Sequence, residues 1–286
     1  ISLNSDSSGL FIAPINEGKP INEGIQDKIL YYDVSKGEIK YDNITVSSSS
    51  AGSTATNESF KSNTNNTSVS STGISIGANS GSTNQGQYSI AIGSDAGKTN
   101  QGKESISIGT LAGETQQSFS SIAIGRHAGS NNQDSSSIAI GAFAGTNNQN
   151  TYSIAIGHSA GNSNQSNGSI ALGHSAGQDR QDNYCIAIGY SSALEDQSNN
   201  SIAIGYASGR SNQGENCLAI GPGSGYQNQG YASIALGGAA GQINQSKNSI
   251  SIGSYAGYYY QDNSAIAIGA SSGKINQGKE SVSIGT

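Results

Sequence analysis

The hydrophobic and polar positions of this chain repeat every 16 residues from residue 73 to its end. Each unit opens with a small residue, usually Ser, and continues with an apolar–small–apolar triplet such as Ile154-Ala155-Ile156, after which comes a Gly. Alternation with period two is typical of a β-strand, and helix-pair repeats need about 33 residues or more. We therefore expect an all-β fold, a β-solenoid (β-roll) of about fourteen 16-residue coils, with a small N-terminal β-hairpin unit.

Stacking the coils at about 4.8 Å turns each position of the repeat into a column and predicts a rod of roughly 60 Å. We expect the two isoleucine columns, represented by Ile154 and Ile156, to point inward and form the core. The column of Ala155 would then point outward with Ser153 and form a flat face of small side chains suited to packing between chains. Gly157 is expected at a corner, where a side chain would clash or φ is positive.

Two further columns are small or polar. Ala160-Gly161 is expected at a second tight corner or in a thin part of the core. A Gln lies in every complete unit and predicts a partly buried ladder of amides bonded from coil to coil; the alternative is an exposed glutamine face that binds a ligand. The members of this column are Gln85, Gln101, Gln117, Gln133, Gln149, Gln165, Gln181, Gln197, Gln213, Gln229, Gln245, Gln261 and Gln277.

The pattern divides the chain into three parts: an N-terminal β unit for attachment or oligomer packing (1–45), a Ser/Thr/Asn-rich linker (46–72) and the solenoid (73–286). The first part contains strand-like runs at Gly9–Ile15, Lys28–Asp33 and Glu38–Tyr41, the last two joined by a turn. An extended segment that wraps neighbouring chains is an alternative for the linker. Because the repeat stops within a unit, we expect either a longer native chain or a partner over the last coil.

Composition narrows the choice of partners. The net charge of −6 argues against nucleic acid, and no apolar run is long enough to span a bilayer.

Cys185 and Cys217 occupy one column two coils apart, so their Cα atoms are about 10 Å from each other and beyond disulfide reach. We expect two free thiols.

Two motifs resemble known families. The repeat Ser-Ile-Ala-Ile-Gly-x-x-Ala-Gly, over 73–286, is similar to the heads of trimeric autotransporter adhesins, which implies a left-handed β-roll and three rolls to a head; the period of those heads is shorter and they lack the Asn-Gln element. The N-terminal runs Gly9–Ile15, Leu30–Asp33 and Gly37–Tyr41 resemble a segment of fibre-like proteins of large DNA viruses and phages. Such fibres often carry a C-terminal chaperone domain that trimerises them and cleaves itself off. Together the resemblances imply a surface fibre or adhesin.

Aromatic residues supply the candidate binding sites. His158, His174, Tyr190 and Tyr206 follow a corner glycine on four successive coils, which predicts a ladder of rings. A glycan-binding strip is one interpretation; the favoured one is that ring contacts stabilise the stack.

A second group of aromatic residues lies towards the end of the chain. Tyr258, Tyr259 and Tyr260, with Tyr226 and Tyr255 nearby, predict another aromatic cluster; a contact surface is one interpretation of it, and a purely structural cluster is the other.

We expect that the protein is not an enzyme and that it binds neither a cofactor nor a metal ion. The three histidines, His127, His158 and His174, have no carboxylate or cysteine at the spacing of a metal site or catalytic triad. The leading hypothesis is a homotrimeric structural fibre or adhesin on a virion or cell surface, with a surface glycan or receptor as its partner. An ice-binding or filament-forming extracellular solenoid is the alternative, and a polysaccharide-cleaving β-helix is a weaker one.

Overall fold

The computed structural model describes residues 28–33, 38–43 and 72–286, and these residues are all-β with no helix. In the N-terminal unit, β1 (Lys28–Asp33) and β2 (Glu38–Asn43) pair antiparallel, with Lys28 opposite Asn43 and Asp33 opposite Glu38. This confirms the predicted hairpin strands. The predicted strand Gly9–Ile15 and the predicted linker, apart from its last residue, lie outside the described residues.

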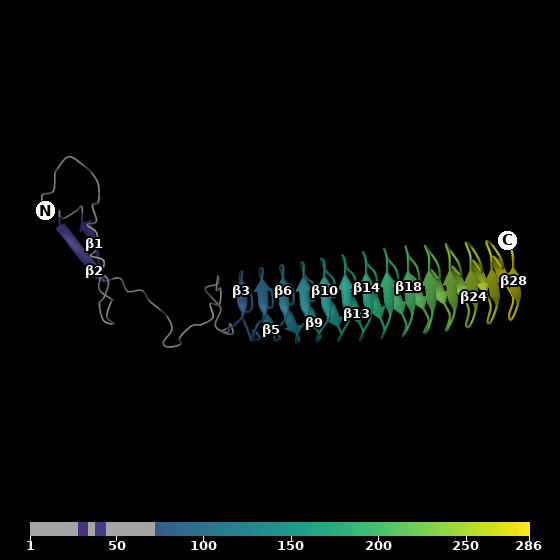
Figure 1. Cartoon of the computed structure of the whole chain (residues 1–286), viewed down its shortest axis with the longest axis horizontal. Helices are drawn as coiled ribbons and strands as arrows, with labels where there is room; N and C mark the ends of the chain where they lie inside the picture. Colours follow the sequence, from purple (N-terminus) through teal and green to yellow (C-terminus); the bar gives the residue numbers. More distant parts are fainter. Residues whose placement is uncertain (1–27, 34–37, 44–71) are drawn as a thin grey trace, which may run out of the picture. The chain divides into compact units, whose positions relative to one another are not determined.

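The solenoid consists of two parallel sheets, and each coil adds one short strand to each sheet (Figure 1). Strands pair with their counterparts one coil away, so that Ile154 lies opposite Ile170 and Ala155 opposite Ala171. Gln165 lies opposite Gln181 in the same way in the second sheet. The uninterrupted register confirms the predicted β-solenoid.

The first sheet has 14 strands. They are β3 (Ile74–Ile76), β4 (Ile90–Ile92), β6 (Ile106–Ile108), β8 (Ile122–Ile124), β10 (Ile138–Ile140), β12 (Ile154–Ile156), β14 (Ile170–Leu172), β16 (Ile186–Ile188), β18 (Ile202–Ile204), β20 (Leu218–Ile220), β22 (Ile234–Leu236), β24 (Ile250–Ile252), β26 (Ile266–Ile268) and β28 (Val282–Ile284).

The second sheet has 12 strands and is extended by an isolated bridge from Thr83 to Thr99. Its strands are β5 (Thr99–Gln101), β7 (Thr115–Gln117), β9 (Asn131–Gln133), β11 (Asn147–Gln149), β13 (Ser163–Gln165), β15 (Asp179–Gln181), β17 (Glu195–Gln197), β19 (Ser211–Gln213), β21 (Gln227–Gln229), β23 (Ile243–Gln245), β25 (Tyr259–Gln261) and β27 (Ile275–Gln277).

The corners are made by residues in left-handed backbone conformations. Gly157 has φ 130°, and a Cβ placed on it would lie 2.4 Å from the carbonyl oxygen of Gly173 in the next coil. Glycine is therefore needed both for the conformation and for the close approach of two backbones. Asn164, in the middle of β13, has φ 57°, a region that Asn tolerates better than most residues. This requirement explains the recurrent Asn immediately before the buried Gln.

The core is made of small and amide side chains, and the predicted orientation of the first sheet is wrong. Ala155 and Ser153 are fully buried, whereas Ile154 and Ile156 are only half-buried. The same holds along the sheet, where the middle residue of nearly every triplet is buried and its two apolar neighbours are half-buried or exposed.

The thinness of the coil explains this reversal. A Cβ placed on Gly161 would lie 3.2 Å from the Cβ of Ala155 and 2.6 Å from Oε1 of Gln165. The interior therefore has room for one layer of alanine and serine against the glutamine amides, and branched side chains must point outward. Ala160, also fully buried, fills the predicted tight corner.

Candidate functional site

The outward face of the first sheet carries two continuous columns of aliphatic side chains. Each coil presents one pair, such as Ile138 and Ile140, which lie opposite Ile154 and Ile156 of the next coil. Neighbours above and below cover the flanks of each side chain, which leaves its outer end in water. The face grows more exposed at some coils, for instance at Leu172, which is 41% exposed.

The interior face of the second sheet holds the predicted glutamine ladder. Nε2 of Gln165 donates to Oε1 of Gln181 at 3.1 Å, to the carbonyl of Ile154 at 2.9 Å and to that of Ser169 at 3.2 Å. Coil-to-coil amide bonds of the same direction run without a break from Gln101 to Gln277. The glutamines are buried, so the alternative of an exposed ligand-binding glutamine face is wrong.

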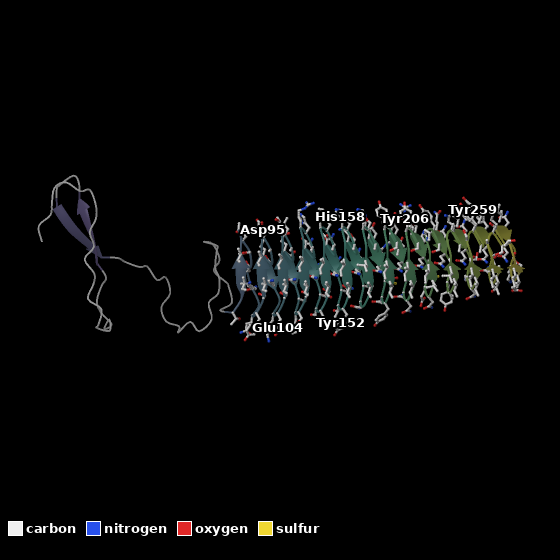
Figure 2. All side chains as sticks on the ribbon, turned by 45° about the horizontal axis from the view of Figure 1, so that its top comes forward. Asp95, Glu104, Tyr152, His158, Tyr206 and Tyr259 are labelled. Atoms are coloured by element: carbon white, nitrogen blue, oxygen red, sulfur yellow. The ribbon has the colours of Figure 1, made fainter. Side chains whose placement is uncertain are left out.

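The predicted ring ladder lies along one edge of the solenoid, where Figure 2 labels His158 and Tyr206. The rings of His158 and His174 stack at 5.0 Å between centroids, and so do those of His174 and Tyr190; Tyr190 and Tyr206 stack at 5.5 Å. Each inner ring is covered on both faces by its neighbours. A sugar that stacks on an aromatic face has access only to the ends and edges of this ladder, and its role in binding stays a prediction.

Sequence reasoning missed two rings that extend the ladder. Phe143 meets His158 edge-on at 5.9 Å and stacks on His127 at 5.2 Å, while the guanidinium of Arg126 lies 4.3 Å from the Phe143 centroid. Phe143 and His127 are one position later in the repeat than His158, so the column pattern did not connect them. Both occupy a corner position at which φ is positive in coil after coil, with values of 61° and 57°.

The predicted tyrosine cluster forms around β25 (Tyr259–Gln261). Tyr258 contacts Tyr255 and Tyr259 at 5.4 and 4.8 Å between ring centroids, and Tyr259 lies 6.1 Å from Tyr260. Tyr260 is 56% exposed. Tyr226 was expected nearby, but its contacts are with Arg210, which donates to its hydroxyl at 2.6 Å.

Both cysteines are free, as predicted, but they are buried in the serine column of the interior and do not lie on the outward face expected for that column. Sγ of Cys185 lies 2.9 Å from the carbonyl oxygen of Ser198, and Sγ of Cys217 lies 2.8 Å from that of Gly230. Desolvation by burial raises the pKa of both thiols.

Two surface carboxylates also have perturbed pKa values. Partial burial, and then the neighbouring Glu195 and Asp196, raise the pKa of Asp179. A hydrogen bond and ion pair with Lys98, at 3.0 Å, hold the pKa of Asp95 below its usual value. Within residues 28–33, 38–43 and 72–286, no group of three or more His, Cys, Asp and Glu side chains is placed to hold a metal ion. The same residues include no helix long and apolar enough to cross a membrane.

Comparison of the chain with protein-family models, with curated proteins and with solved structures finds no significant match.

Proposed function

We propose that this protein is a structural fibre whose solenoid rods associate as a homotrimer through the isoleucine face. The single observation that carries the proposal is the aliphatic face on the first sheet, from β3 to β28, which no other element within residues 72–286 covers. The sequence-based interface, the face of Ser153 and Ala155, is not available because both residues are buried.

The size of the face supports association. Fourteen strands at about 4.8 Å give a length of roughly 60 Å, and two outward side chains per strand are about 7 Å apart. The strip therefore covers on the order of 400 to 600 Å². The largest apolar patch on a typical monomer covers about 300 to 600 Å² and is often functional, so a strip of this size supports a contact role. A second copy of the chain is the occupant that fits best, because it carries a strip of the same length and the same coil spacing.

We infer the number of chains in the assembly, three, and its location from the two family resemblances of the sequence. The repeat is similar to adhesin heads made of three rolls, and the N-terminal motif is similar to fibre-like viral and phage proteins. We place the rod on a virion or cell surface, where its edges carry attachment contacts to a surface glycan or receptor. A role as a scaffold, without catalysis, agrees with a solenoid that has no insertions between coils.

Light scattering on the native protein tests the proposal through its mass, which is 28.9 kDa for one chain. The variant Ile138→Asp/Ile154→Asp places two charges on the face. Its control, Asn148→Asp/Asn164→Asp, places two charges at exposed positions of the second sheet.

We expect a trimer for the native protein and the control, and a monomer with an unchanged circular dichroism spectrum for the isoleucine variant. A monomeric native protein overturns the assembly. A trimer that persists in the isoleucine variant overturns the choice of interface.

A further inference from the structure

Two hollows of the same design lie on the outward side of the second sheet. Each is centred on the position just before a buried Gln, and each has an Asn in that column one coil before and one coil after. The first, of about 490 Å³, is lined by Asn100, Gln116, Gln117, Ser118, Asn132 and Asp134. The second, of about 380 Å³, is lined by Asn244, Ser246, Tyr260, Gln261, Asp262, Asn276, Gln277 and Gly278.

The second hollow lies where a ladder of exposed asparagines is interrupted. Nδ2 of Asn212 donates to Oδ1 of Asn228 at 3.1 Å, and Asn228 donates to Asn244 at 2.8 Å. The next member of the column is Tyr260, which has no amide to accept from Asn244. Nδ2 of Asn244 therefore donates no hydrogen bond to any residue within 72–286, and the amide of Asn276 on the other side is exposed.

We propose that the hollow around Tyr260 binds a neutral sugar. The inference rests on the attachment role proposed above and names the site and the ligand class. The ring of Tyr260 offers an apolar surface to the C–H face of a pyranose. The amides of Asn244 and Asn276 and the carboxylate of Asp262 supply donors and acceptors for its hydroxyl groups, the combination of one apolar surface and a few polar groups that small-molecule sites use.

An open ring face beside a hollow distinguishes Tyr260 from the stacked rings of the ladder; Tyr152 is more exposed, at 69%, but lines neither hollow. In the ladder of His158, His174 and Tyr190, neighbouring rings are stacked within 5.0 Å and within 13° of parallel, so the inner faces are occupied. Tyr260 meets Tyr259 at 6.1 Å and 33°, a tilted arrangement that leaves its ring 56% exposed beside the hollow.

Charge selects the class of sugar. Asp262 is exposed at the rim, and the chain carries a net charge of −6. Both disfavour sialic acids, uronic acids and sulfated sugars, because like charges repel at the short distances of a binding site. Neutral hexoses and N-acetylhexosamines meet no such penalty.

The first hollow serves as an internal comparison. It has the flanking asparagines and a carboxylate, Asp134, but its central residue is Gln116, which has no ring. If ring stacking is essential, only the second hollow binds sugar in the native chain. Gln116→Tyr should then create a second site, since both central residues have φ near 55°.

The test is a glycan array carrying neutral and sialylated oligosaccharides, followed by titration calorimetry with the neutral oligosaccharide that binds best. Tyr260→Ala is compared with Tyr152→Ala, which removes an exposed ring on the edge opposite to His158 and Tyr206 (Figure 2). We expect Tyr260→Ala to weaken binding about tenfold or more, Tyr152→Ala to leave it unchanged, and Gln116→Tyr to raise the number of sites from one to two.

Three results overturn the inference: no neutral glycan is bound, the two alanine variants bind equally well, or sialylated glycans are preferred. Light scattering on the same samples tests the proposed trimer separately from the sugar site. A trimer that binds no sugar contradicts the sugar site alone, whereas a monomer that binds sugar at Tyr260 contradicts the assembly alone.

Discussion

Nε2 of Gln117 donates a hydrogen bond to Oε1 of Gln133, its counterpart one coil later, at 3.2 Å. The same nitrogen donates to the carbonyl of Ile106 at 2.9 Å, while Oε1 of Gln117 accepts from the hydroxyl of Ser107 at 2.6 Å. One buried side chain thus joins its own coil to the next and connects the two sheets.

Replacing this amide should be costly. Gln117→Leu leaves the carbonyl of Ile106, the hydroxyl of Ser107 and Oε1 of Gln133 without their partner in a dry interior. We expect the free energy of unfolding to fall by about 2 to 4 kcal/mol, since each buried unsatisfied group costs about 1 to 3 kcal/mol. Chemical denaturation monitored by circular dichroism measures the change.

The adjacent Gln116 provides the control. It is exposed and its side chain lies outside the ladder, so Gln116→Leu should change stability by no more than about 0.5 kcal/mol. Equal losses in the two variants would show that the buried ladder does not stabilise the solenoid.

The reversed orientation of the first sheet gives a second prediction. Ala155→Leu adds three carbon atoms where only a small side chain fits, and overpacking of this kind costs about 1 to 3 kcal/mol or more. Ile154→Ala removes carbon atoms from a half-buried position and should cost the isolated rod less than Ala155→Leu does. Melting temperatures of the two variants, measured on monomeric protein, compare the two losses of stability. A larger loss for Ile154→Ala would indicate that the isoleucines, and not the alanines, form the core.

The repeat pattern in the sequence was enough to predict the solenoid, its coil length, the hairpin strands, the buried glutamines and the stacked rings. It could not predict which side of the first sheet faces inward. Period-two alternation groups Ile154 with Ile156 and Ala155 with Ser153, but it is symmetric with respect to inside and outside. The thickness of the interior decides, and it depends on how closely the two sheets approach at Gly161.

Two other features could not be predicted from the sequence, because they depend on the backbone conformation. The Asn column follows from the left-handed conformation at Asn164, and Phe143 contacts His158 from the neighbouring corner position, where φ is positive in coil after coil. The hollow at Tyr260 lies where a ring replaces the usual Asn of its column, which departs from Asn also at Gln116, Arg180 and Asp196. A search for exceptions within each column would have drawn attention to Tyr260, although not to the hollow itself.

The corner glycine gives a third prediction. Gly157→Ala introduces a Cβ 2.4 Å from a carbonyl oxygen of the next coil and forces alanine to φ 130°. We expect a loss of at least about 3 kcal/mol, because strain in such regions alone costs about 1 to 3 kcal/mol. Thermal unfolding of the variant measures it.

Gly168→Ala is the matched control for this corner. Its φ is 63°, and Ala232 occupies the same column at φ 52°. The added Cβ would meet only the exposed ring of Tyr184, at 3.0 Å, which can move aside. A loss of about 1 to 2 kcal/mol is expected, and an equal loss in both variants would contradict the close backbone approach at Gly157.

The buried thiols give the last prediction. Cys185 and Cys217 take the place of a serine that elsewhere donates to the carbonyl three residues earlier, as Ser169 does to Ser166 at 2.6 Å. Both thiols should resist iodoacetamide in the folded protein and react in guanidinium chloride, because reagent and base reach them only after unfolding. Mass spectrometry measures the labelling. Labelled cysteines in the native protein would contradict their burial.

Stability should also respond to pH through these thiols. Burial raises their pKa in the folded state, so the unfolded chain loses their protons first. Their contribution is complete below the unfolded thiol pKa of about 8.5 and declines as pH rises above it, by up to about 1.4 kcal/mol per pH unit and thiol. Cys185→Ser/Cys217→Ser removes this decline. The native protein should therefore lose more stability than the double variant between pH 8 and 9.5, and parallel losses would show that the two thiols titrate alike in the folded and unfolded chains.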